Sequence, residues 1–174
     1  MTIVVDVANV MGSRPDGWWR DRAGAAARLH AQVVRLAASG RATLPPQAGP
    51  ADDAGPAGEA GPADDAAPAD DAGPPGFVMV LEGAAKAALA RMPPEERAAA
   101  VEVRPGNVRL GEVRPGEVRV ALAPGSGDDA IVTVVRELPG RHVVVTADRE
   151  LRGRCVAAGA TILGPGWLLG LLRD

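Results

Sequence analysis

The sequence predicts an α/β fold in which helices cover both faces of a mostly parallel sheet of about five strands. Short apolar, β-branched segments alternate along the chain with segments whose apolar residues recur at helical spacing. This alternation is typical of βαβ units, whose parallel strands are buried on both faces. Acidic residues stand at or just beyond the ends of the first four expected strands. Ligands bind at that edge of open parallel sheets, so the pattern also predicts where a functional site lies.

The first part of the chain predicts two strands and three helices. A Gly/Pro-containing loop follows the first strand, Gly40 stands where the first long helix should end, and Pro94 suits a helix start. In order, these elements are a strand at 2–6, a helix at 19–39, a strand at 77–81 and short helices at 84–91 and 94–100.

The second part predicts three more strands, two helices and a terminal apolar turn. Gly159 stands where the last helix should end. In order, these elements are a strand at 118–122, a helix at 128–138, a strand at 142–146, a helix at 149–158, a strand at 161–163 and an apolar turn around 167–172.

Residues 45–76 differ in composition from the rest of the chain. They hold ten Ala, eight Pro, six Gly and seven acids, with no basic, β-branched or aromatic residue. Such a segment buries too little apolar surface to offset the entropy of ordering. We therefore interpret 1–174 as one domain interrupted by a disordered insert at 45–76.

The net charge of −3 comes from 19 basic and 22 acidic residues, and seven of these acids belong to the insert. The remaining 142 residues therefore carry four more basic than acidic residues, which is compatible with a phosphate-bearing substrate. One cysteine excludes a disulfide framework, and two distant histidines disfavour a histidine metal site. The sequence has no membrane-spanning run and no recognisable signal peptide, so a cytoplasmic location without a membrane partner is expected.

Two consecutive decapeptides, at 102–111 and 112–121, match at seven of ten positions. A duplicated hairpin or a lengthened edge strand is the simplest interpretation. The four arginines at 104, 109, 114 and 119 can alternatively form a basic strip.

Five carboxylates are expected at the carboxyl edge of the sheet. Clustered carboxylates repel one another unless a cation neutralises them, and oxygen ligands suit Mg²⁺ or Mn²⁺. The individual acids have plainer interpretations, because an acid that follows a strand can cap the next helix or lie in solvent. It is the combination that favours a metal site. The acids are Asp6, Glu82, Asp128, Asp129 and Asp148.

The loop after the first strand brings arginine and tryptophan to the same edge. An arginine beside an exposed indole suits nucleotide or single-stranded RNA binding, through phosphate pairing and base stacking. One of the two tryptophans is instead expected to anchor the helix that follows, and helix-surface solvation is an equal alternative for Arg149. The residues concerned are Arg14, Trp18, Trp19, Arg20, Arg22 and Arg149.

These motifs resemble the acidic motifs of PIN-like nucleases of the NYN type. The resemblance rests on DVAN at 6–9, Glu82 after the second strand, GDDAI at 127–131, TADREL at 146–151 and the tail AGATILG at 158–164. Residues 6–22 resemble a bacterial, commonly actinobacterial, subgroup often labelled NTP pyrophosphohydrolases. Val7 stands where the family usually has Gly, and Glu82 where it more often has Asp. The insert and the decapeptides have no counterpart.

The resemblance implies a three-layer Rossmann-like (PIN-like) domain that hydrolyses phosphodiesters or phosphoanhydrides with Mg²⁺ or Mn²⁺. It assigns metal binding to Asp6, Asp128 or Asp129, and Asp148, which together activate a water and neutralise charge on the phosphate. Asn9 is expected to orient a ligand or a metal-bound water, and Thr146 to donate to a phosphate oxygen. Glu82 is expected to complete the acidic ring or to position the water.

Three functional interpretations follow. The first is a metal-dependent nuclease acting on RNA, the second an NTP pyrophosphohydrolase using the same site, and the third a catalytically weak RNA- or protein-binding module. The expected partner is therefore RNA or a nucleotide substrate, and a homo-oligomer is among the open alternatives for the assembly.

Overall fold

Six parallel strands form a single sheet in the computed structural model, which describes residues 1–45, 73–106 and 108–173. Their order across the sheet is β3-β4-β2-β1-β5-β6. The predicted α/β class with a parallel sheet is thus confirmed. The strands are β1 (Thr2–Asp6), β2 (Gly76–Leu81), β3 (Val101–Glu102), β4 (Val118–Leu122), β5 (His142–Val145) and β6 (Thr161–Leu163).

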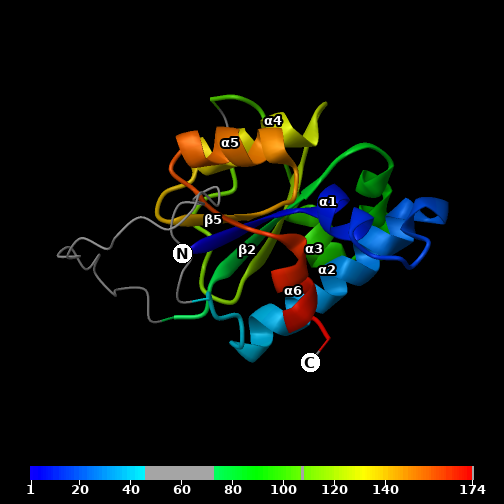
Figure 1. Cartoon of the computed structure of the whole chain (residues 1–174). Helices are drawn as coiled ribbons and strands as arrows, with labels where there is room; N and C mark the ends of the chain where they lie inside the picture. The colour runs from blue at the N-terminus through cyan, green and yellow to red at the C-terminus, as the bar shows by residue number, and fades with distance from the viewer. Residues whose placement is uncertain (46–72, 107, 174) are drawn as a thin grey trace.

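Helices lie on both faces of this sheet (Figure 1). In Figure 1, α4 and α5 lie above the sheet, whereas α2, α3 and α6 lie below it. The helical elements are α1 (Val7–Gly12), η1 (Trp18–Arg20), α2 (Arg22–Ser39), η2 (Gly83–Arg91), α3 (Pro94–Ala98), α4 (Gly127–Glu137), α5 (Arg149–Ala157) and α6 (Pro165–Leu171), of which η1 and η2 are 3₁₀ helices.

Alternation along the strands divides the interior into two apolar cores. On β1, Ile3 and Val5 belong to the core beneath α1, α2 and α6, whereas Val4 belongs to the core beneath α4 and α5. Successive strand residues point to opposite faces, so a strand buried on both faces must be apolar throughout. That requirement explains the continuous TIVV and FVMV runs, which made β1 and β2 easy to predict.

The direction of winding changes between β1 and β5, which are neighbours in the sheet. The chain leaves β1 toward α1 and α2 on one face, and leaves β5 toward α5 on the other (Figure 1). Connections that diverge in this way open a crevice outside the carboxyl ends of the two strands. The ends of β1 and β5 carry Asp6 and Thr146, so the fold itself positions the candidate site.

The structure corrects several details of the predicted elements. It has six strands rather than about five, because Val101–Glu102 adds a two-residue edge strand beside β4. A helix, α1, begins directly after Asp6, where a loop was expected; its six residues are too few for a helical period to be visible. The terminal apolar turn is a helix, α6, that begins at Pro165.

The residues of the two decapeptides that the structure describes form no hairpin. Between β3 and β4 the described residues turn repeatedly, and Gly106, Gly111 and Gly116 adopt positive φ angles that interrupt an extended chain. Of the four arginines of the decapeptides, Arg104 pairs with Glu102 and Arg119 with Glu117.

The prediction for the insert falls on 46–72, which lie outside the described residues. Within the described ranges, no helix is both long and apolar enough to cross a membrane.

Candidate acidic site at the carboxyl edge of the sheet

A cavity of about 470 Å³ lies at the carboxyl edge of the sheet. Four carboxylates from four different strand ends line it, together with an amide and an indole. Six of the predicted site residues therefore come together in one place. The lining consists of Asp6, Ala8, Asn9, Gly12, Ser13, Trp18, Glu82, Asp128 and Asp148.

Asp6 ends β1 and also caps α1. Its Oδ1 accepts the Asn9 backbone N–H at 3.0 Å, and its Oδ2 accepts the Thr146 hydroxyl at 2.9 Å. The side chain has two neutral donors and no ion-pair partner within 4 Å among the described residues. Asp6 is only 7% exposed, so this burial carries a desolvation cost that the two hydrogen bonds partly offset.

Thr146 and Asn9 connect the two strands that flank the crevice. The Thr146 hydroxyl donates to Asp6 and accepts the Asp148 backbone N–H at 3.1 Å, and its residue is 1% exposed. Asn9 Oδ1 accepts the Ala147 backbone N–H at 3.0 Å. Both side chains therefore position the acidic groups and the loop after β5. The predicted donation from Thr146 to a phosphate is not visible in this arrangement, because that proton is directed to Asp6.

Glu82 follows β2 and is held by the beginning of α4. Its Oε2 accepts the Gly127 backbone N–H at 2.7 Å. The close approach needs a glycine, since a Cβ at position 127 would stand 2.7 Å from the same oxygen. The Glu82 side chain, which is longer than that of an aspartate, thus reaches from the end of β2 to the beginning of α4. It connects these two parts of the cavity wall.

Asp128 and Asp129 have different positions, although both stand in the first turn of α4. Asp128 lines the cavity, whereas the 71%-exposed side chain of Asp129 pairs with Arg154 at 2.6 Å. Consecutive helical residues point about 100° apart, so only one of the two can face the cavity. Neither caps α4: Ser126 is the cap, accepting the Asp129 backbone N–H.

Asp148 both caps a helix and lines the cavity. Its Oδ1 accepts the Leu151 backbone N–H at 2.8 Å and so begins α5. The capping interpretation and the site interpretation, which the sequence presents as alternatives, therefore coexist in one side chain.

Burial and mutual repulsion both raise the pKa values of two acids in the cavity. Burial raises the pKa of Asp6, and the negative charges of Asp128 and Glu82 add to the rise, while the Asn9 and Thr146 hydrogen bonds oppose it. Burial likewise raises the pKa of Asp128, followed by repulsion from Asp148 and Glu82. A cation in the cavity would relieve this repulsion.

The described residues do not, however, present a ready-made set of metal ligands. No three or more His, Cys, Asp or Glu side chains among them lie in an arrangement that could hold a metal ion. An ion in the cavity would have to keep part of its hydration shell, as Mg²⁺ does when it takes only one or two carboxylates directly. The metal assignment to Asp6, Asp128 and Asp148 thus stays a prediction, and Asp129 does not face the cavity.

The predicted arginine and tryptophan residues separate into two groups. Trp18 lines the cavity, with the Arg22 guanidinium 5.4 Å from its ring centre and the 57%-exposed Trp19 ring edge-on to it. The remaining predicted substrate-binding residues, Arg14, Arg20 and Arg149, do not line this cavity.

Sequence reasoning missed three lining residues, Ala8, Gly12 and Ser13. All three belong to α1 or the position that ends it, so missing α1 meant missing them. Asp6, an aspartate directly before a short apolar segment, is the capping signal that would have indicated this helix.

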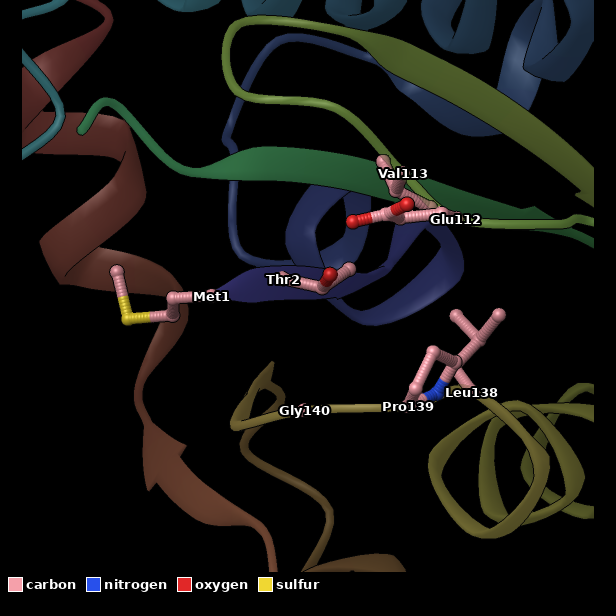
Figure 2. A pocket seen from close by; sticks show the side chains of 7 residues that line it. All are labelled: Met1, Thr2, Glu112, Val113, Leu138, Pro139 and Gly140. Atoms are coloured by element: carbon pink, nitrogen blue, oxygen red, sulfur yellow. The ribbon is translucent and has the colours of Figure 1, made fainter. Parts of the chain in front are cut away.

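A separate hollow of about 250 Å³ lies at the opposite, amino edge of the sheet (Figure 2). Figure 2 shows Thr2 facing it from β1, with Glu112 and Val113 on one side and Leu138, Pro139 and Gly140 on the other. Among the described residues that line it, Glu112 supplies the only charged side chain. This hollow lacks the convergent polar groups of the acidic cavity.

Comparisons with protein-family models, with curated proteins and with solved structures found no match. The functional interpretation accordingly depends on the residues and geometry of the cavity.

Proposed function

We propose that this protein is a divalent-metal-dependent phosphohydrolase that cleaves phosphodiester bonds of RNA at the acidic cavity. The observation that carries the proposal is that four carboxylates line one cavity without an ion-pair partner among the described residues. Carboxylates kept together in this way favour a bound cation. The cation class is Mg²⁺ or Mn²⁺, because the donors are oxygen atoms.

The chain's own groups are well placed to hold the acids still. Backbone N–H groups and the Thr146 hydroxyl bind one oxygen of Glu82 and Asp148 and both oxygens of Asp6. Within the described ranges, Asp128 accepts no hydrogen bond of this kind, which leaves its carboxylate available in the cavity. A bound metal ion would supply activation of a water and neutralisation of phosphate charge.

Trp18 favours a nucleotide as the substrate. Its indole lines the same cavity as the carboxylates, so a base stacked on the ring would place its phosphate near the acids. The same feature suits a nucleoside triphosphate, and the test below therefore includes both substrates.

The test measures hydrolysis of end-labelled single-stranded RNA and of nucleoside triphosphates with Mg²⁺, with Mn²⁺ and with EDTA. RNA cleavage that needs a metal is expected, and Asp128→Asn is expected to lower it about 10- to 100-fold or more. Asp129→Asn is the matched comparison, because it removes a charge from the same helical turn but outside the cavity. Its effect is expected to stay within about 3-fold, as for an exposed ion pair.

The outcomes separate the alternatives. Metal-dependent hydrolysis of triphosphates but not of RNA would identify a pyrophosphohydrolase. RNA binding without turnover of either substrate would indicate a binding module and contradict the proposal. Equal losses in Asp128→Asn and Asp129→Asn would contradict the placement of the reaction at this cavity.

A further inference from the structure

A second cavity, of about 260 Å³, adjoins the acidic one. Ser13, at the end of α1, lines both cavities. The second cavity is otherwise different in character, because Arg14 and Arg173 line it together with Gln32 and Asp16. A basic hollow therefore stands beside an acidic one, with one residue as the common wall.

The guanidinium of Arg14 is fixed in this hollow. It donates to Gln32 Oε1 at 2.9 Å, which connects the segment after α1 to the middle of α2. Gln32 accepts this bond with its amide oxygen, so the positive charge of Arg14 is oriented but not neutralised.

The Arg173 guanidinium lines the same hollow as that of Arg14, and Arg28 adds a further positive charge that acts on Arg14. Burial lowers the pKa of Arg14, nearby Asp16 opposes this, and the charges of Arg28 and Arg173 add to it. Arg28 is one helical turn before Gln32 on α2, and Arg173 follows α6. Arginine stays protonated in proteins, so Arg14 and Arg173 form a lasting positive cluster in the hollow, whereas the charge of Arg28 also interacts with Asp21.

This cluster has little compensation within the described part of the chain. Arg14, Arg28 and Arg173 form no ion pair with a described carboxylate within 4 Å. Asp16 is the one acid of the lining, and its Oδ1 accepts the Trp18 backbone N–H. Two guanidiniums and one carboxylate in the same hollow favour a phosphate over a cation.

We propose that Arg14 and Arg173 bind the phosphate of the nucleotide next to the one in the acidic cavity, on the same single-stranded RNA. The proposal rests on the function proposed above and adds a second phosphate-binding site for the same RNA strand. A continuous chain needs anchoring on both sides of the acids, which otherwise repel its flanking phosphates. Trp18 offers base stacking within the acidic cavity, and the arginine cavity offers phosphate pairing beyond Ser13.

The experiment measures binding without turnover. Fluorescein-labelled oligouridylates of two, four and eight nucleotides are titrated by anisotropy at several salt concentrations. All proteins carry Asp128→Asn, and the test variant adds Arg14→Gln and Arg173→Gln. The matched control adds Arg136→Gln and Arg141→Gln, which remove two exposed charges away from both cavities.

In the control, affinity is expected to rise from the dinucleotide to the octanucleotide and to fall with salt. The test variant is expected to lose at least about 10-fold in octanucleotide affinity, and the slope of log K against log salt is expected to flatten by roughly 1.4, since each single-strand phosphate contact contributes about 0.7. Arg28→Gln and Arg173→Gln singly are further variants. Both side chains are exposed, so the fold does not depend on them.

Equal octanucleotide affinity and equal salt slope in the test and control variants would overturn the inference, even if the native chain cleaves RNA. Conversely, arginine-dependent binding in a protein that hydrolyses neither RNA nor triphosphates would contradict the proposed function and leave this inference supported. The two failures are therefore distinguishable.

Discussion

At the residue scale, Thr146 illustrates how one buried hydroxyl organises charged groups. It donates to Asp6 and accepts from the backbone of Asp148, so two acids of the cavity depend on the same oxygen atom. Without this hydroxyl, Asp6 Oδ2 and the backbone N–H of Asp148 would have lost their hydrogen-bond partner.

Replacing Thr146 by Val keeps the shape but removes the hydroxyl. The free energy of unfolding is expected to fall by about 1–3 kcal/mol, because Asp6 Oδ2 and the Asp148 N–H lose their partner. Urea denaturation measures the loss. Thr161→Val on β6, where the described structure shows no side-chain hydrogen bond, is the control. A loss no larger than that of the control would show that the Thr146 bonds contribute little.

Gly127 is a second position where a single side-chain atom decides the outcome. Alanine normally favours a helix over glycine by about 1 kcal/mol. Gly127→Ala should therefore stabilise α4 if nothing opposed it. The new Cβ would instead meet the Glu82 carboxylate, which must move and release the Gly127 N–H. We expect lower thermal stability and hydrolysis reduced to the level of Glu82→Gln.

Gly125→Ala serves as the comparison, since a Cβ at position 125 meets nothing within 4 Å. If Gly127→Ala were as stable and as active as Gly125→Ala, the contact between Glu82 and the beginning of α4 would contribute to neither stability nor hydrolysis.

At the element scale, helix beginnings supply much of the site. Asp6 caps α1 and Asp148 caps α5, while α4 presents Asp128 to the cavity and binds Glu82 through its first N–H. Helix N-termini attract negative charge through their free N–H groups and dipole. Three helix starts that converge on one edge can therefore hold several carboxylates close together despite their repulsion.

The double role of Asp148 can be separated by two substitutions. Asn caps helices about as well as Asp, so Asp148→Asn is expected to keep the free energy of unfolding within about 1 kcal/mol. Asp148→Ala loses the cap and is expected to cost about 0.5–2 kcal/mol. Both should lower hydrolysis alike, because both remove the charge.

Ser126→Ala supplies the reference for a cap without a cavity role, since Ser126 caps α4 but does not line the cavity. It should lower stability while preserving turnover. Full hydrolysis by Asp148→Asn would contradict the assignment of this carboxylate to the reaction.

At the scale of the whole molecule, two buried histidines predict how stability depends on pH. Burial lowers the pKa of His30 below its ordinary value of 6.5, despite attraction from Glu96, and lowers that of His142, with repulsion from the N-terminal amine adding to it. Both rings are thus favoured in the neutral form when the chain is folded.

The unfolded chain consequently binds more protons than the folded one just below pH 6.5. The histidine contribution to stability is complete above that pH and is lost as the pH falls toward the lowered folded-state values. Each histidine contributes a slope of at most about 1.4 kcal/mol per pH unit. Urea denaturation between pH 5 and 8 (about the range in which histidine titrates) measures it.

His142→Gln is expected to flatten this dependence by removing one titrating group, and the loss of both histidines should flatten it further. A stability that rises as the pH falls through this range would contradict the prediction.

The sequence by itself determined most of the elements and the edge at which the acids lie. Strands buried on both faces must be apolar along their whole length, and that constraint leaves a local, readable pattern in β1, β2 and β5. The positions of the acids can also be read from the sequence, because each acid stands at or just after the end of a strand segment. The two-residue β3 has no such pattern and could not be predicted, and α1, which is too short to show a period, is indicated only by its capping residue Asp6.

Only the tertiary structure decided which charged side chains share a cavity. Asp128 and Asp129 are equivalent in sequence, but the rotation of α4 turns one to the cavity and the other to Arg154. Likewise, Arg14, Gln32 and Arg173 line one hollow only because α2 and α6 pack on the same face of the sheet. Side-chain direction and long-range packing are set by the assembled fold, and no local pattern encodes them.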